Sequence, residues 1–187
     1  MSFYTKQALA GALKDMLSTK SLDRITVIEL VETCKLSRQT FYYHFQDIYD
    51  LLGWIYKTEA LAAINNSRSY ETWKQGLMTI LEYMEANRAL CINTYRSLGK
   101  EHLEMFLNQV LNELLGDVID EIVDTHNISE EDKRFIIRFY SHAFAGSLLD
   151  WIRDGLKMPS NMMVDYIERL MEGQFVDLAE RFDGKDG

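Results

Sequence analysis

Residues 25–45 read ITVIELVETCKLSRQTFYYHF, and this stretch decides the fold of the amino-terminal part of the chain. Thr26 lies three residues before Glu29, so its hydroxyl and the glutamate carboxylate can each accept from a free backbone N–H, as in a capping box. Ser37 is a second good N-cap, for a short helix over residues 38–43. Two short helices joined by a turn of a few residues predict a helix-turn-helix.

One side of this helix pair is apolar. The side chains that can form a small core are Val27, Leu30, Val31, Leu36, Phe41 and Phe45. Phe41 and Phe45 are four residues apart, so they share a side of the second helix. The remaining side chains of that helix can donate hydrogen bonds and carry no negative charge: Arg38, Gln39, Thr40, Tyr42, Tyr43 and His44. Because Gln pairs with adenine, Arg pairs with guanine and Thr offers a methyl to thymine, this face suits a DNA major groove.

The charge of the chain is unevenly distributed. The net charge of −9 over 187 residues by itself disfavours a nucleic-acid partner. Residues 1–46, however, hold six basic and four acidic side chains, +2 in total, which leaves −11 for the remainder. This asymmetry indicates that the first part meets an anion. A second interpretation of residues 38–44 is a solvated surface with an aromatic lid, but the serine cap and the cluster of donors favour DNA binding.

The rest of the sequence predicts an all-α fold of about nine helices. Apolar residues recur at helical spacing, only one proline is present, and alternating strand patterns are missing. The predicted helices are residues 5–18, 26–34, 38–43, 47–66, 70–86, 88–98, 101–125, 129–153 and 160–182. We expect a helix-turn-helix DNA-binding domain over 1–46 and a larger helical domain over 47–187 for ligand or partner sensing and dimerisation.

The sequence carries no pattern typical of a catalytic or metal site. Its four histidines form no His-x-x-x-His or Glu-x-x-His pair, and no phosphate-binding or nucleophile motif is present. Cys34 and Cys91 are 57 positions apart and fit no metal or redox spacing. We expect no enzyme activity, cofactor or metal. The longest uncharged stretch, Phe139–Leu149, has eleven residues, too few to span a membrane, so we expect a cytoplasmic protein without a membrane partner.

Residues 5–52 resemble the DNA-binding head of the TetR family of transcriptional regulators. The matching pieces are Ile25-Thr26-Val27, the block from Ser37 to Phe45 and Leu51-Leu52. The resemblance implies phosphate contacts from Thr26, Ser37, Tyr42 and His44, and base contacts from Arg38, Gln39, Thr40 and Tyr43. Gln39-Thr40-Phe41 followed by residues 51–55, LLGWI, is also similar to the TetR-type regulators of dihydroxyacetone kinase operons, some of which use a kinase-like protein as their sensor.

Two positions differ from the family pattern. The family usually has Ala-Gly in the turn, where this chain has Cys34 and Lys35. A lysine with a left-handed backbone costs up to about 1 kcal/mol, although it also adds a cation near the DNA. The family tends to begin the fourth helix with a lysine that meets a phosphate, and Ile48 occupies that position here. One phosphate contact fewer should weaken binding and flatten its salt dependence.

The resemblance also implies a sensing site in the larger domain. Polar and aromatic side chains that could line it are Tyr83, Tyr95, Arg96, His102, Tyr140 and His142. We therefore expect a sequence-specific DNA-binding transcriptional repressor, controlled by an unknown small molecule or protein co-regulator. The alternative is a helical protein-interaction module or co-activator whose head no longer binds a specific operator.

The last two predicted helices indicate a homodimer. Residues 129–153 are apolar on more than one side, which predicts that this helix is buried on two sides. The predicted interface residues are Ala143, Ala145, Gly146, Leu149, Ile167, Leu170 and Met171. A four-helix bundle across a two-fold axis would present two recognition helices to half-sites about 34–36 Å apart on double-stranded DNA. In the alternative, both helices complete the core of a monomer.

Overall fold

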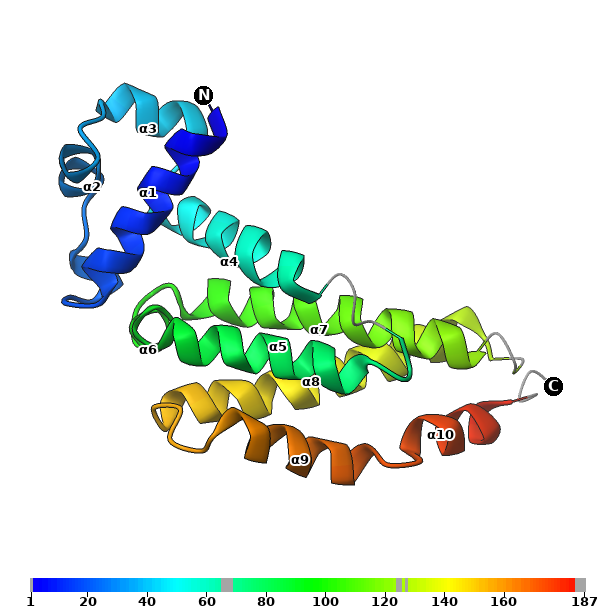
Figure 1. The fold of residues 1–187 in the computed structure, drawn as a ribbon. Helices are drawn as coiled ribbons and strands as arrows, with labels where there is room; N and C mark the ends of the chain where they lie inside the picture. The colour runs from blue at the N-terminus through cyan, green and yellow to red at the C-terminus, as the bar shows by residue number, and fades with distance from the viewer. Residues whose placement is uncertain (1, 65–68, 124–125, 127, 184–187) are drawn as a thin grey trace.

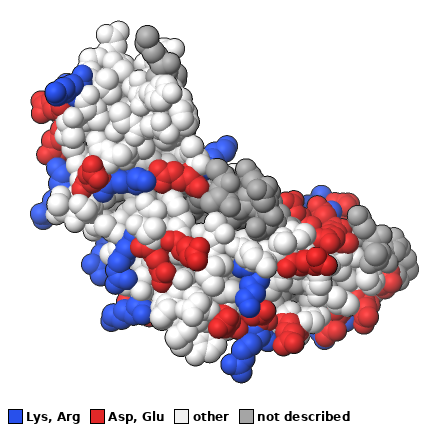
Figure 2. Space-filling view, in the orientation of Figure 1, with Lys and Arg blue, Asp and Glu red and all other residues white. Residues whose placement is uncertain are grey.

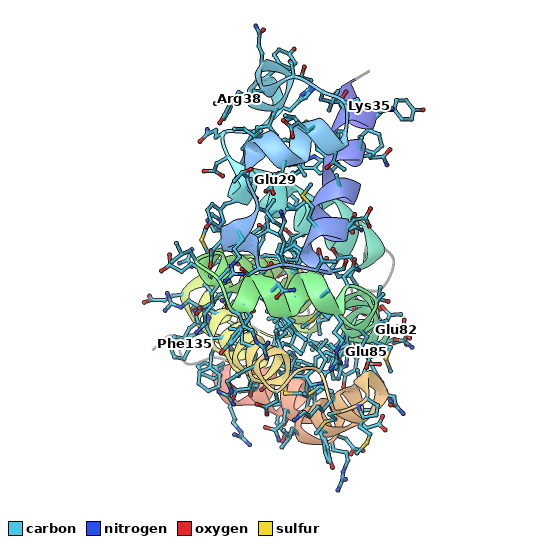
Figure 3. The ribbon with its side chains drawn as sticks, turned by 90° about the vertical axis from the view of Figure 1, so that its left-hand side faces the viewer. Glu29, Lys35, Arg38, Glu82, Glu85 and Phe135 are labelled. Atoms are coloured by element: carbon cyan, nitrogen blue, oxygen red, sulfur yellow. The ribbon has the colours of Figure 1, made fainter. Side chains whose placement is uncertain are left out.

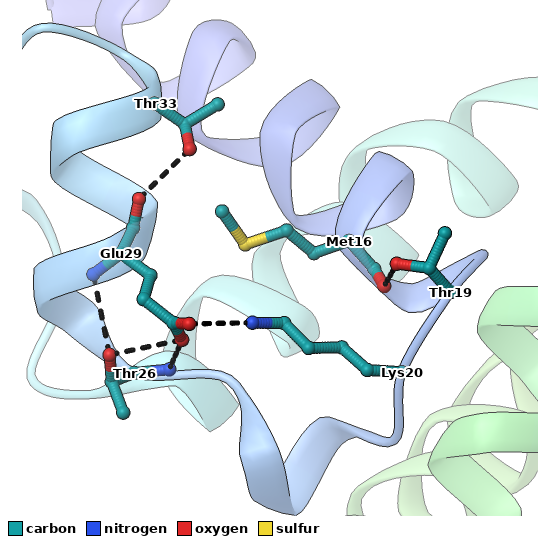
Figure 4. Close-up of polar contacts among 6 residues, drawn as sticks. All are labelled: Met16, Thr19, Lys20, Thr26, Glu29 and Thr33. Carbon is teal, nitrogen blue, oxygen red and sulfur yellow. Dashed lines mark hydrogen bonds and ion pairs between the residues drawn. The ribbon is translucent and has the colours of Figure 1, made fainter.

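The two short helices of residues 25–45 begin where their capping residues stand. α2 (Val27–Thr33) follows Thr26, whose Oγ1 accepts from the Glu29 N–H at 3.3 Å while the Glu29 carboxylate accepts from the Thr26 N–H at 3.1 Å. α3 (Arg38–His44) follows Ser37, whose Oγ accepts from the Thr40 N–H at 3.0 Å. Both predicted caps are confirmed. Figure 4 shows the first one, with Lys20 donating to Glu29 at 2.8 Å.

This computed structural model describes residues 2–64, 69–123, 126 and 128–183, which are helical and contain no strand. The predicted all-α class is therefore confirmed. The head consists of α1 (Ser2–Leu17), a 3-10 turn η1 (Leu22–Arg24), α2 and α3 (Figure 1). The predicted core side chains Leu30, Val31, Phe41 and Phe45 are buried, and Val27 and Leu36 pack against them.

The head continues through a long helix into the body (Figure 1). α4 packs against α1 on the head side and against α5 and α7 on the body side, and α7 also runs along α8. None of the helices in the described ranges is both long and apolar enough to span a membrane. The helices of the body are α4 (Ile48–Ile64), α5 (Trp73–Ala86), α6 (Arg88–Tyr95), α7 (Lys100–Val123), α8 (Glu130–Arg153), α9 (Ser160–Met171) and α10 (Gln174–Phe182).

The single helix predicted over residues 160–182 is wrong. The chain ends α9 at Met171 and restarts at Gln174 because Glu172, with ψ of 117°, leaves the helical conformation and Gly173 has a left-handed φ of 73°. Apolar periodicity continues across the break, so periodicity alone did not reveal it. The predicted helix ends at Asn66 and Thr125 lie outside the described residues.

Close contacts hold the head against the body near α6. The Asn93 side-chain amide donates to the carbonyl of Leu17 at 2.6 Å. Gly99 lies so close to the 3-10 turn that an added Cβ would be 2.8 Å from a methyl of Leu22. The orientation of the head, and with it of α3, therefore depends on short contacts to residues 93–99.

Candidate nucleic-acid interface

The outer surface of α3 is formed by the side chains predicted to contact DNA. Phe41 and Phe45 are buried in the head, whereas Tyr43 is 82% exposed. No acidic residue lies within α3. The side chains that the structure leaves exposed or half-buried on this helix are Arg38, Gln39, Thr40, Tyr42, Tyr43 and His44.

The cap residues of the two helices lie beside this surface. Thr26 is exposed, but its hydroxyl also donates to Glu29 at 3.2 Å. The Lys20 amine beside Glu29 holds the pKa of that carboxyl below its usual value, so the carboxylate remains ionised and retains the cap. Ser37 is exposed, with its Oγ 2.8 Å from the hydroxyl of Thr40.

Lys35 adopts the strained backbone expected at the turn, with φ of 54°. Its N–H donates to the carbonyl of Glu32 at 3.1 Å, and the Leu36 N–H donates to that of Val31 at 2.8 Å. These two bonds form a Schellman motif, which terminates α2 and usually has glycine at this position. The predicted left-handed lysine is confirmed, and its side chain is exposed next to α3.

The two ends of the molecule differ in charge. Lys35 and Arg38 lie at the tip of the head, far from Glu82, Glu85 and Phe135 in the body (Figure 3). Acidic side chains gather over the part of the body that is farthest from the head (Figure 2). A polyanion would therefore meet the head with less repulsion than it would meet the body.

Ile48 lies where the family tends to have a phosphate-binding lysine, and its side chain has no hydrogen-bond donor. It is half-buried in the first turn of α4 and packs against the core. Asp47 and Asp50 lie beside it, and the Asp50 N–H donates to Asp47 Oδ1 at 2.8 Å, so Asp47 caps the start of α4. This end of α4 therefore carries acidic capping groups and an apolar side chain.

The six predicted sensing residues do not line one cavity. His102 and His142 share an open groove of about 760 Å³ between α4, α7 and α8, and the other four do not line it. His102 stacks on Tyr49 with ring centroids 5.1 Å apart. Arg96 is exposed, and Tyr83, Tyr95 and Tyr140 are half-buried.

Each of the three tyrosines already has a neighbour within the protein. Tyr83 donates to Glu59 at 3.1 Å, and burial together with that carboxylate raises the pKa of its hydroxyl. The Tyr95 ring lies 4.9 Å from the Lys100 ammonium. The Tyr140 ring lies against Phe144 and Phe175.

Among the groove residues that the sequence analysis did not single out, Asn108 has an unusual environment. Asn108 lines the groove, and its buried Oδ1 has no hydrogen-bond partner among the described residues. A single asparagine within a predicted helix has no partner at a telling spacing, so only the fold identifies it. Within the described ranges, no group of three or more His, Cys, Asp or Glu side chains is arranged to hold a metal ion.

The predicted interface residues fall into two groups. The ones exposed in the single chain are Ala143, Gly146 and Leu170, and Leu149 is half-buried. The ones already buried in the chain's own core are Ala145, Ile167 and Met171. Thus α8 and α9 each pack one side against the core of the body, and another side is exposed in the single chain. Phe135 and Phe139 add exposed aromatic rings to that side of α8.

Comparison with known proteins finds a matching family model and a curated relative. A family model, the transcriptional regulator C-terminal region TetR_C_8, matches residues 71–173, more than half of the chain. A curated relative, the HTH-type dhaKLM operon transcriptional activator DhaS of Lactococcus lactis subsp. lactis, is 33% identical over 87 residues, 46% of this chain and 46% of the relative. That match thus spans about half the length of the relative.

Two solved structures share the whole fold. One is the dihydroxyacetone kinase operon activator DhaS, with a TM-score of 0.72 and 25% identity, covering 96% of this chain and 98% of that one. The other is the TetR family repressor AlkX from Dietzia sp., with a TM-score of 0.55 and 13% identity, covering 92% and 95%. The second likeness concerns the fold alone.

Proposed function

The chain belongs to the TetR family of transcriptional regulators, and from this we propose that its residues 1–46 bind a specific operator in double-stranded DNA. Residues 47–187 would then dimerise and respond to an effector. The observation that carries the proposal is the outer surface of α3, which has no acidic residue, is rich in donors and lies at the less acidic end of the molecule.

We assign the contacts by the exposure and the chemistry of each side chain. Arg38 and Gln39 are exposed at the start of α3, and such side chains pair with guanine and adenine edges. Thr40 has its hydroxyl engaged with Ser37, so its methyl is the group left for a thymine. Tyr43 would also face bases. Phosphate contacts, which position the protein, fall to Thr26, Lys35, Ser37, Tyr42 and His44.

The relatives suggest the sign of regulation. The sequence led us to expect a repressor, but the relative at 33% identity and the solved structure at 25% identity both carry the name DhaS, an operon activator. We therefore propose activation, with a dihydroxyacetone kinase operon as the first target to test. A reporter gene placed downstream of the bound operator distinguishes activation from repression. An activator raises reporter expression when the gene for this protein is present.

The free sides of α8 and α9 support the proposal of a homodimer. Ala143 and Gly146 would let a second helix approach closely, and Leu170 would be buried by it. The dimer would present two copies of α3 to half-sites about one turn of DNA apart, so the operator should be a near-palindrome. An effector, either a small molecule or a protein, would act on the body, with the groove at His102 and His142 as its site.

A mobility-shift assay on the DNA upstream of the protein's own gene tests the function. Arg38→Ala or Gln39→Ala should weaken operator binding by about 1–3 kcal/mol and relax base preference at particular positions. Arg181→Ala is the matched control, because Arg181 is exposed on α10, in the body. If neither head variant alters affinity or preference, α3 does not read bases, and the protein-interaction alternative gains support.

A further inference from the structure

Aromatic rings form a continuous row that leads from the end of α3 to the start of α1. Successive ring centroids along the row are between 4.9 and 6.5 Å apart. Its members, in order, are Tyr43, His44, Phe45, Trp54, Phe3 and Tyr4. The middle of the row is packed into the head, whereas Tyr43 and Tyr4 at its two ends are 82% and 77% exposed. Figure 1 shows the start of α1 beside the end of α3.

Lys6 lies over the middle of this aromatic row. Its ammonium is 5.2 Å from the centroid of Phe45 and 5.8 Å from that of Trp54, a cation–π arrangement that holds the side chain in place. Lys14, in α1, and Lys20, just after α1, have carboxylate partners: Lys14 binds Glu59 at 2.9 Å, and Lys20 binds Glu29 at 2.8 Å.

Lys6 differs from them, because it has no carboxylate partner in the part of the chain that the structure describes. Residues 1–14 also contain no acidic side chain. The end of α1 that adjoins the recognition helix therefore has a positive charge that the protein leaves uncompensated.

We propose that Lys6, Tyr4 and Phe3 extend the DNA interface beyond α3 and bind the sugar-phosphate backbone next to the bases that α3 contacts. The Lys6 ammonium would pair with a phosphate, the Tyr4 hydroxyl would donate to a phosphate oxygen, and Phe3 would lie against deoxyribose. The inference rests on the proposed operator binding. Duplex DNA is the occupant that fits, because the surface is continuous with α3 and combines a cation with hydroxyl donors.

The salt dependence of DNA binding tests the role of Lys6. Lys6→Gln keeps most of the side-chain stem and removes the charge. It should lower the slope of log K against log salt by about 0.9 and weaken specific and random duplexes to the same extent, because phosphate contacts carry no sequence information. Lys157→Gln is the matched control. Lys157 is exposed between α8 and α9, in the body, so the slope should not change.

Tyr4→Phe tests the hydroxyl separately from the charge. It should weaken binding about threefold to tenfold and leave the slope unchanged, since no ion is lost. A scan of neutral methylphosphonate linkages should then find one linkage that weakens the wild type but not Lys6→Gln. Because Tyr4 is highly exposed, its variant should keep the wild-type melting temperature.

The outcomes distinguish the inference from the function on which it rests. If the wild type binds the operator but Lys6→Gln has the wild-type slope and linkage profile, the extended interface is wrong and operator binding stands. If the wild type binds no duplex, both are overturned. If Lys6→Gln weakens only the operator and not random DNA, Lys6 acts through base recognition, and the proposed backbone contact is wrong.

Discussion

Lys35 combines two properties that a substitution can separate. Its left-handed backbone closes the Schellman motif at the end of α2, where a side chain is strained, and its ammonium is exposed beside the proposed DNA surface. A glycine would keep the motif, relieve the strain and remove the charge. The residue therefore offers a comparison of folding stability with DNA affinity at a single position.

Lys35→Gly should raise the free energy of unfolding by up to about 1 kcal/mol, because glycine adopts a positive φ without a steric penalty. It should also reduce the salt slope of DNA binding by about 0.9 if Lys35 meets a phosphate. Urea denaturation and salt titration measure the two effects. Lys35→Ala is the control: it keeps the strain and loses the charge, so only the slope should fall. Equal stability of the two variants would contradict the strain.

The two cysteines should differ in reactivity. Burial raises the pKa of the Cys91 thiol to about 12, so almost no thiolate forms near neutral pH, and the side chain is fully buried. Burial also raises the pKa of Cys34, but its side chain is half-buried. Because the thiolate is the nucleophile, alkylation of Cys34 should increase as the pH rises towards its pKa, and Cys91 should remain unlabelled.

Mass spectrometry of peptides after treatment with iodoacetamide at mildly alkaline pH measures this difference. In concentrated guanidinium chloride both thiols should label, which provides the control for intrinsic reactivity. Labelling of Cys91 in the native protein at a rate similar to that of Cys34 would mean that the core around α6 opens readily.

Among the elements, the break between α9 and α10 depends most on a single residue. Gly173 has a left-handed backbone, and its carbonyl accepts from the Asp177 N–H at 3.0 Å, so it ends one helix and begins the next. The break lets Phe175 pack edge-to-face on Trp73 and be buried in the body. A continuous helix would place the residues after 173 on a different path.

Gly173→Ala should therefore destabilise the protein by about 1 kcal/mol, because alanine is strained at a positive φ even though nothing blocks its Cβ. Gly11→Ala is the matched control. Gly11 lies inside α1 with open space where a methyl would be added, so alanine there should stabilise by about 0.5–1 kcal/mol. Urea denaturation compares the two, and a stabilising Gly173→Ala would show that α9 and α10 can fuse into one helix.

At the scale of the whole molecule, the body leaves an apolar side of α8 and α9 uncovered. Leu170 is 74% exposed, and α8 adds Phe135 and Phe139 to the exposed apolar surface. Contiguous exposed apolar surface marks an interface more often than a single exposed side chain does, and Phe135 and Phe139 stack with ring centroids 6.4 Å apart. A symmetric dimer would also place two heads on one operator. A substitution that prevents dimerisation should therefore weaken operator binding as well.

Leu170→Glu should shift the chain from a dimer to a 21.8 kDa monomer in sedimentation equilibrium at micromolar concentration, because the dimer would bury the new charge. Leu98→Glu is the matched control: Leu98 is 80% exposed near the junction of α6 and α7, so the dimer should persist. A wild-type protein that sediments as a monomer would contradict the dimer and the near-palindromic operator together.

The head could be predicted closely because its signals are local. The capping pair Thr26 and Glu29, the Ser37 cap and the four-residue spacing of Phe41 and Phe45 all act within one or two helical turns. The backbone geometry that they favour is therefore readable from neighbouring residues. The left-handed backbone of Lys35 was expected instead from the resemblance to the TetR family, which usually has glycine in this turn. Periodicity alone also predicted an all-α body, but it missed the break at Gly173, since apolar spacing continues across it.

Contacts between residues distant in the sequence needed the tertiary structure. Ala143 and Ala145 lie on the same apolar helix, and the sequence does not tell them apart. In the structure, one side of α8 faces the body, so Ala145 is buried and Ala143 is exposed. Likewise, the aromatic row joins Phe3 to Trp54 only because α1 packs against α4. Local signals in the sequence were enough to predict the all-α class and the caps that shape the head. The packing of those helices decided which side chains are left free to bind, because burial is a property of the assembled chain.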